Sequence, residues 1–196
     1  MNLKKQRTWS VAIVGIVIFL ALGSSDSGSS GRNSSTPTTA DQPTASNSEA
    51  EPEALDPQLT WQYDESSDEM GRGKIRTAFV SSLNEVDFDF PYQGAQRAQL
   101  VLRRHPKYGR NVILQVEKGQ ILTGIDGCDV QVRFDGGKAR TYRGMGAADH
   151  STTSVFLNNF DRFIAAAKKA KKVYIEAPFY QEGERVFEFN VKDLKF

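Results

Sequence analysis

The residues that most resemble a catalytic group are Asp149, His150 and Ser151, which are consecutive in the chain. An acid, a histidine and a hydroxyl are the side chains of a hydrolase that acts through a nucleophilic serine. The histidine of such an enzyme lies between the other two in space, which adjacent residues rarely achieve. The sequence also lacks the Gly-x-Ser-x-Gly motif. We therefore interpret this segment as a turn. The alternative hypothesis is a hydrolase that uses Asp149, His150 and a nearby hydroxyl.

A group of lysines forms the second candidate site. It consists of Lys168, Lys169, Lys171 and Lys172. Cations stabilise the C-terminal end of a helix through its dipole, so the simplest interpretation is a solvated helix end. A basic cluster can also bind an anionic partner. We take Asp149, His150 and the four lysines together as the candidate interaction surface.

No other set of residues matches a metal or cofactor site. His105, His150 and the single cysteine, Cys128, do not have the spacing of zinc ligands. The Gly-Met-Gly of residues 144–146 lacks the third glycine and the strand–helix context of a dinucleotide site. The sequence therefore predicts no catalytic residue, no metal ligand and no cofactor.

Two arginines and an aromatic segment have structural interpretations. Arg103 and Arg133 alternate out of the apolar side of their expected strands, so we expect them to pair with acids across the sheet. A basic strip that binds an anionic partner is the alternative. The aromatic segment Phe88–Gly94 predicts a loop packed on the core, with a platform for a sugar or peptide as the alternative.

The most informative stretch of the chain contains the lysines. Apolar residues just before them recur at i, i+3, i+4 and i+7 and predict an amphipathic helix: Phe160, Phe163, Ile164 and Ala167. Asn158 or Asn159 is expected to cap this helix. Alternating residues in 173–177 and 187–191 then predict a hairpin with its turn at 181–184. We expect the helix to cover the apolar face of the hairpin.

Short alternating segments fill the rest of the domain and predict strands. They occupy residues 59–63, 75–83, 98–103, 112–116, 128–134, 138–143 and 154–157. Asp135-Gly136-Gly137 predicts a tight hairpin turn, because paired glycines accept a positive φ. Cys128 falls on the apolar side of its strand and is expected to be buried. The expected fold is mainly β with one amphipathic helix: an antiparallel sandwich or open barrel of about eight or nine short strands with a helix lid.

The chain begins with a segment of the export type. Lys4, Lys5 and Arg7 precede about 14 uncharged residues, fewer than the roughly 20 that span a bilayer comfortably. Residues 1–23 are therefore expected to be a signal peptide or an uncleaved signal anchor. Both alternatives place the rest of the chain outside the cytoplasm, in the periplasm or anchored in the inner membrane.

Residues 24–57 are rich in Ser, Thr and Pro and contain no aromatic residue, so a disordered linker is expected. The linker carries six acids against Arg32. The N-terminal segment adds three cations and the whole chain has a net charge of +1, which leaves +3 for residues 58–196. That excess is too small to favour a nucleic-acid binder. Residues 58–196 have the length of a single domain.

Several segments together resemble a family of uncharacterised exported or membrane-anchored bacterial domains that follow a Ser/Thr-rich linker. The resemblance covers roughly residues 100–196 and rests on the segments Val132–Lys138, Asp149–Thr153 and Ile175–Gly183. Relatives often carry a second cysteine near Thr123, and its absence here implies that Cys128 is unpaired. The order of elements is also similar to periplasmic type VI secretion-associated proteins of the VasI kind. Neither resemblance implies catalytic residues.

The leading hypothesis is a non-enzymatic exported binding domain of the bacterial envelope, with a secretion-associated role implied by the second resemblance. The expected partner is another envelope protein, and the N-terminal segment would add a membrane contact if it is not cleaved. A further hypothesis is that Lys168, Lys169, Lys171 and Lys172 dock on an anionic membrane surface.

Overall fold

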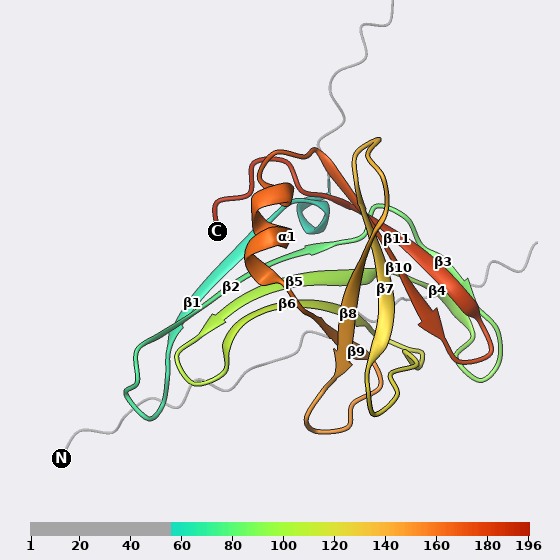
Figure 1. Ribbon diagram of the computed structural model, residues 1–196, viewed down its shortest axis with the longest axis horizontal. Coiled ribbons are helices and arrows are strands. Elements are labelled where there is room, and N and C mark those ends of the chain that lie inside the picture. The colour runs from blue at the N-terminus through green and yellow to red at the C-terminus, as the bar shows by residue number, and fades with distance from the viewer. Residues whose placement is uncertain (1–55) are drawn as a thin grey trace, which may run out of the picture. The chain divides into compact units, whose positions relative to one another are not determined.

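Most alternating segments form strands in the structure, a computed structural model that describes residues 56–196 (Figure 1). Nine strands make one antiparallel sheet, in the order β1 (Gln62–Ser67), β2 (Lys74–Ser81), β5 (Ala98–His105), β6 (Gly109–Val116), β9 (Ser154–Leu157), β8 (Arg140–Gly146), β7 (Cys128–Phe134), β10 (Lys172–Phe179) and β11 (Gly183–Asn190). Two short strands, β3 (Val86–Phe88) and β4 (Gly94–Gln96), form a separate hairpin. The signal segment 1–23 and nearly all of the linker 24–57 lie outside the described residues.

The nine-stranded sheet curls round without closing into a barrel. In Figure 1, the axes of β1, β2, β5 and β6 are roughly aligned, and those of β7, β8, β10 and β11 cross them steeply. The free side of β11 meets the segment after β2, where Leu83 N–H donates to the Glu188 carbonyl (2.6 Å). The Asn84 side chain bridges the same seam, because it donates to the Val186 carbonyl (2.9 Å) and accepts the Glu188 N–H (2.8 Å). The expected antiparallel, mainly β fold is confirmed, in its open form.

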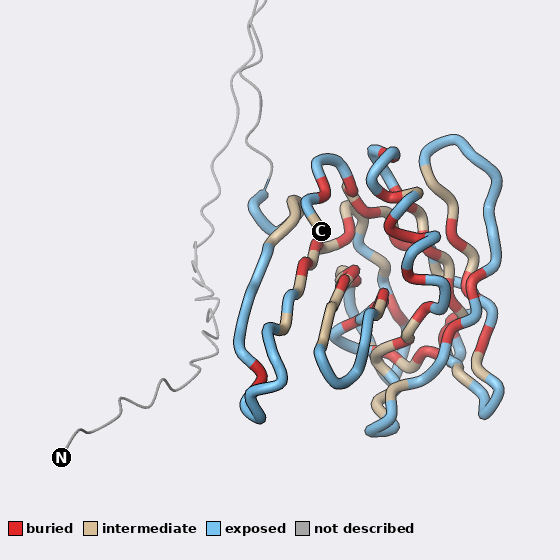
Figure 2. Tube along the Cα trace, turned by 60° about the vertical axis from the view of Figure 1, so that its left-hand side comes forward, coloured by how far each residue is buried: buried red, intermediate tan, exposed pale blue. Residues whose placement is uncertain are grey.

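The inner face of the curled sheet holds the core. Alternate residues of the central strands are buried there, and Figure 2 shows the buried positions interleaved with exposed ones. They include Leu100, Leu102, Val112, Leu114, Val130, Val132, Val173, Ile175, Phe187 and Phe189. Each such side chain contributes about 1.5–3 kcal/mol by its burial. Cys128 lies in this core, and desolvation raises the pKa of its thiol, so the expectation of a buried cysteine is confirmed.

Helix α1 (Phe160–Ala167) forms where the apolar periodicity predicts it, but it packs chiefly against β6, β7 and β8 rather than over the β10–β11 hairpin that it was expected to cover. Phe163 meets the ring of Phe134 at 5.3 Å between centroids and that of Tyr142 at 6.0 Å, both edge-on. On the solvent side, Arg110 of β6 forms a two-point ion pair with Asp161, with one N–O distance of 2.8 Å. The helix is therefore fastened to the sheet on both its apolar and its polar side. Its buried face comprises Phe160, Phe163, Ile164 and Ala167.

The helix differs from its prediction at both ends. It is shorter, because Lys168 already lies at its C-cap and Lys172 is the first residue of β10. Asn159 occupies the N-cap in a left-handed conformation (φ 57°), and its side chain makes no capping hydrogen bond. The side-chain oxygen of Asn158 instead accepts the N–H of Arg143 (3.1 Å). Of the two predicted capping residues, Asn159 thus occupies the N-cap position, while Asn158 holds strand β8.

Strand β1 begins later than predicted and runs into the acidic segment. A single 3-10 turn, Pro57–Leu59, precedes it, and the strand starts at Gln62. The acids remain in the strand because β2 supplies cations opposite them. Glu65 pairs with Arg76 (2.8 Å) and with Lys74.

β8 continues past its predicted end to Gly146, and Gly144 faces the core where a Cβ would overlap the Val155 side chain. The aromatic segment Phe88–Gly94 forms the predicted loop, which joins the short strands β3 and β4 and shares only its first and last residues with them. Phe88 packs on Phe179 with ring centroids 5.1 Å apart, so this part of the segment does pack on the core.

Antiparallel pairing gives the curled sheet two rims. The first, which we call the loop rim, lies at the C-terminal ends of β2, β6, β8 and β10. It carries residues 82–97, 117–127, 147–153 and 180–182. We call the opposite one the helix rim; it carries turns 68–73, 106–108 and 135–139, helix α1 with its flanking residues, and residues 191–196. Asp149 and His150 therefore lie at the loop rim, and the four lysines lie at the helix rim.

Candidate functional site

Asp149 and His150 lie in an exposed turn of the loop rim. The Asp149 carboxylate accepts the N–H of Ser151 (3.0 Å), and the His150 N–H donates to the Ala147 carbonyl (3.0 Å). The Ser151 hydroxyl shares a hydrogen bond with Thr153 (3.0 Å) rather than with a base. Within residues 56–196, no hydrogen bond joins the His150 imidazole to an acid or a hydroxyl. This arrangement lacks the relay between base and nucleophile, so it gives the hydrolase alternative no support.

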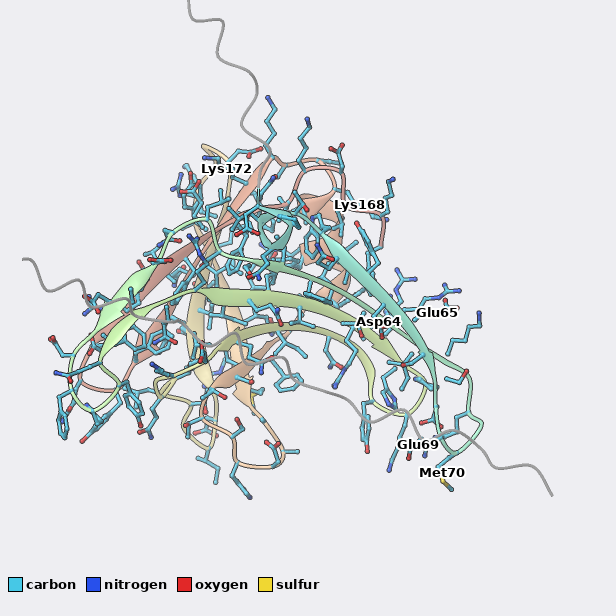
Figure 3. All side chains as sticks on the ribbon, turned by 180° about the vertical axis from the view of Figure 1, so that it is seen from behind. Asp64, Glu65, Glu69, Met70, Lys168 and Lys172 are labelled. Atoms are coloured by element: carbon cyan, nitrogen blue, oxygen red, sulfur yellow. The ribbon has the colours of Figure 1, made fainter. Side chains whose placement is uncertain are left out.

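The four lysines form an exposed cluster with two cations of the β7–β8 turn and strand β8. The carboxylate of Asp135, in that turn, accepts the N–H groups of Lys171 (3.0 Å) and Lys172 (2.8 Å) and holds the two segments together. Figure 3 shows Lys168 and Lys172 on the same side of the domain. We call this surface the basic corner: Lys138, Arg140, Lys168, Lys169, Lys171 and Lys172.

Most cations of the basic corner have no acidic partner in the part of the chain that the structure describes. Lys172 alone forms an ion pair there, with Glu188 (2.6 Å), and the hydrogen bond that Lys172 donates to that carboxylate raises the pKa of Lys172. The Asp135 carboxylate is already occupied by backbone N–H groups. The remaining positive charge faces solvent, where it can attract an anionic partner.

The loop rim carries the opposite charge. Its acidic residues are Glu85, Asp87, Asp89, Glu117, Asp126, Asp149 and Glu182, and its basic residues are Arg97 and Lys118. The structure therefore divides the candidate interaction surface in two. Asp149 and His150 belong to a negative rim, whereas the four lysines belong to a positive corner on the opposite rim.

A groove on the outer face of the sheet was not predicted. It has a volume of about 480 Å³, and its lining includes Arg103 of β5, Asn111 of β6 and Phe156 of β9, together with Tyr108 and Asp149. Two guanidinium nitrogens of Arg103 donate to the Asn111 side-chain oxygen (3.2 and 2.9 Å), and the guanidinium carbon lies 5.8 Å from the Phe156 ring centroid. Partial burial lowers the pKa of Arg103.

The prediction that Arg103 and Arg133 pair with acids across the sheet is wrong. The residues opposite them in register, Asn111 and Tyr174, are neutral. Arg133 lies 3.9 Å from the Tyr174 ring centroid and donates to the Asp135 carbonyl (2.8 Å). Asn111 follows Arg103 by eight residues in the same hairpin, but Phe156 and Tyr174 come from strands far along the chain, so no local sequence signal could have shown the whole groove.

Neither a metal cluster nor a membrane-spanning helix occurs within residues 56–196. No group of three or more His, Cys, Asp or Glu side chains there is placed to hold a metal ion. The same residues include no helix with the length and apolar character needed to cross a membrane. The N-terminal segment, on which the export and membrane predictions rest, lies outside this range.

Comparisons of the chain with models of known protein families, with curated proteins and with solved structures gave no match. The resemblances carried by the sequence segments therefore stay predictions, and the function has to be argued from the surfaces of this domain.

Proposed function

We propose that this chain is a non-enzymatic binding protein of the bacterial envelope that holds an acidic partner protein at its basic corner. The observation that carries the proposal is the group of clustered cations without an acidic partner among residues 56–196, above all Lys168, Lys169 and Lys171. The export-type N-terminus and the resemblance to exported domains support the envelope location. The resemblance to secretion-associated proteins supports a role in secretion.

The chemistry of the basic corner favours a protein over a lipid surface. Proteins that bind at a membrane surface combine cations with apolar or aromatic side chains that enter the interface. None of the large exposed apolar side chains of the described range is a residue of the corner, although Val186 shares a cavity with Ala139 of the β7–β8 turn. These side chains are Tyr63, Met70, Phe90, Tyr108, Leu122, Ile125, Met145, Tyr180 and Val186. The residues of the corner itself thus offer charge, which suits the carboxylates of an acidic protein surface.

The backbone of the corner is already ordered, which favours a defined interface. Asp135 holds the N–H groups of Lys171 and Lys172, and Ala170 between the lysines is buried. A partner therefore has to order only the lysine side chains, which lowers the entropy cost of binding.

In-cell photo-crosslinking tests the proposal. A photoreactive amino acid replaces Ala165, an exposed residue of α1 that lies one turn before Lys168 and Lys169. We expect the full-length chain to capture one dominant protein with an acidic contact surface. The triple substitution of Lys168, Lys169 and Lys171 by Ala should remove most of this product, because the attraction is electrostatic.

A matched triple variant distinguishes an effect of the basic corner from an effect of net charge. Substituting Lys107, Lys118 and Lys195 by Ala removes the same charge elsewhere and should leave the crosslink intact. Capture of lipid alone, capture of nothing, or equal losses in the two triple variants would each contradict the proposal.

A further inference from the structure

The outer-face groove contains a cation whose hydrogen-bonding capacity is largely unused. Arg103 directs two N–H groups at one neutral acceptor, the Asn111 side-chain oxygen. A guanidinium has five N–H donors, and the others of Arg103 have no partner within residues 56–196. Asp149 lines the same groove but forms no ion pair with Arg103. A partly desolvated guanidinium of this kind is suited to bind a carboxylate at two points.

The floor of the groove continues into an apolar row on the solvent side of the sheet. Phe156 is paired with Ile113 on one side and Met145 on the other. Ile113 is in turn opposite Val101, which is opposite Phe79. These residues alternate with the core residues, so they face away from the inner core. Met145 is the exposed residue of this row, whereas Phe79, Val101 and Phe156 are half-buried and Ile113 is buried, so the row forms an apolar support beneath the groove.

The charged residues at the groove favour one orientation of a bound ligand. Arg103 supplies the positive charge and Asp149 the negative one, while Phe156 and Tyr108 provide aromatic surface. A ligand with one carboxylate beside an apolar group complements Arg103 and Phe156 together. A second carboxylate would meet Asp149 and be repelled. The groove is shallow and open to solvent rather than enclosed, which suits a segment laid across the surface.

We propose that this groove binds an extended segment of a partner protein, in which an acidic side chain meets Arg103 and a neighbouring apolar side chain covers Phe156. The site is separate from the basic corner, so the inference does not rest on the function proposed for that corner. Asp149 favours one orientation of the bound segment and disfavours segments that carry a second acidic residue.

An array of short immobilised peptides tests the site with labelled full-length protein in detergent micelles. The probes are matched pairs that carry an acidic residue next to Leu or Phe, or the corresponding amide in place of the acid. Wild type should prefer the acid by about tenfold, the ratio expected for one charge-assisted hydrogen-bond pair. Arg103→Gln should abolish this preference, and Asp149→Asn should keep it while admitting peptides with a second acid.

Arg133→Gln is the matched control. Arg133 also stacks on an aromatic ring of the outer face, but it already donates to a carbonyl and shares its cavity with Glu176. The acid preference should survive this substitution. Equal binding of acid and amide peptides by wild type would overturn the proposal, as would a preference retained in Arg103→Gln or lost in Arg133→Gln.

Folding of the variants is checked by thermal unfolding. If Arg103→Gln is not folded, Arg103→Lys keeps the charge but not the two-point geometry, and should reduce the preference to a few-fold. An undiminished preference in Arg103→Lys, together with no change in Asp149→Asn, would then exclude the groove.

Discussion

The loop rim and the basic corner of the helix rim use their charged residues differently. At the loop rim, the side chain of Glu182 is only 3% exposed, accepts the N–H of Asp89 (2.7 Å) and pairs with Arg185. At the helix rim, Lys168 and Lys169 form no ion pair with a described residue and face solvent. Charge at the loop rim therefore fastens loops to strands, whereas charge at the basic corner is left for another molecule.

Glycines show the same contrast in packing. Gly127, at the loop rim, has φ +83° and lies so close to strand β8 that a Cβ would overlap the Gly144 carbonyl oxygen. A Cβ added at Gly136, in the turn at the helix rim, would have no neighbouring atom within 4 Å. Substitution of Gly127 should therefore cost stability, while substitution of Gly136 or of the corner lysines that have no described partner should spare it, and the lysine substitutions should change binding.

The largest expected effect is that of Gly127→Ala. The added methyl group meets backbone atoms that cannot rotate away, and the positive φ is strained for alanine. We expect the free energy of unfolding to fall by roughly 3 kcal/mol, measured by urea denaturation followed by circular dichroism.

Gly136→Ala is the control for this prediction, because the turn at the helix rim has open space around that residue. Its free energy of unfolding should stay within about 0.5 kcal/mol of wild type. Equal losses in the two glycine variants would show that the rims do not differ in packing.

Glu182→Gln tests the fastening of the loop rim through its pH dependence. The hydrogen bond from Arg185 and that from the Asp89 N–H hold the pKa of Glu182 below its ordinary value of 4.5. A lowered folded-state pKa gives stability that is present above the unfolded value and is lost as pH falls through the folded one. Wild type should therefore lose more stability than Glu182→Gln between about pH 6 and pH 3. At neutral pH, the variant should unfold a few degrees lower.

The Lys172–Glu188 pair at the helix rim should give stability with the opposite pH dependence. Glu188 raises the pKa of Lys172, so the contribution of this pair is present below the unfolded pKa and is lost as pH rises through the folded one. Lys172→Ala should leave the acid limb of the stability profile unchanged. If it removed the acid sensitivity as Glu182→Gln does, the two rims would share one electrostatic network.

Patterns within one segment carried the successful predictions. The period of Phe160, Phe163 and Ile164 located the helix. Asp135-Gly136-Gly137 located a hairpin turn, but the turn is wider than the tight one expected and Asp135, not a glycine, has the positive φ (46°). Alternation also placed Cys128 in the core. In each case the information lies within a few consecutive turns or residue pairs, where helix and strand periods are visible.

Features that depend on distant partners were missed. Gly144 is typical of a loop in the sequence, yet it lies inside β8 because the core beside Val155 has room only for a hydrogen atom. The groove needs Arg103, Asn111 and Phe156 side by side, which requires the register of β5, β6 and β9. Periodicity gives the face on which a residue lies but not its neighbour across the sheet.

The smallest expected effect concerns the stability of the basic corner itself. Replacing Lys168, Lys169 and Lys171 by Ala removes exposed cations without a described partner, apart from a weak helix-dipole contribution. The free energy of unfolding should change by less than about 1 kcal/mol in urea denaturation. Asp135→Ala, which releases the N–H groups of Lys171 and Lys172, should cost about 1 kcal/mol by itself. If the lysine variant instead lost as much stability as Gly127→Ala, the corner would be structural. Loss of partner capture in that variant would then report unfolding, and the contrast between the two rims would fail.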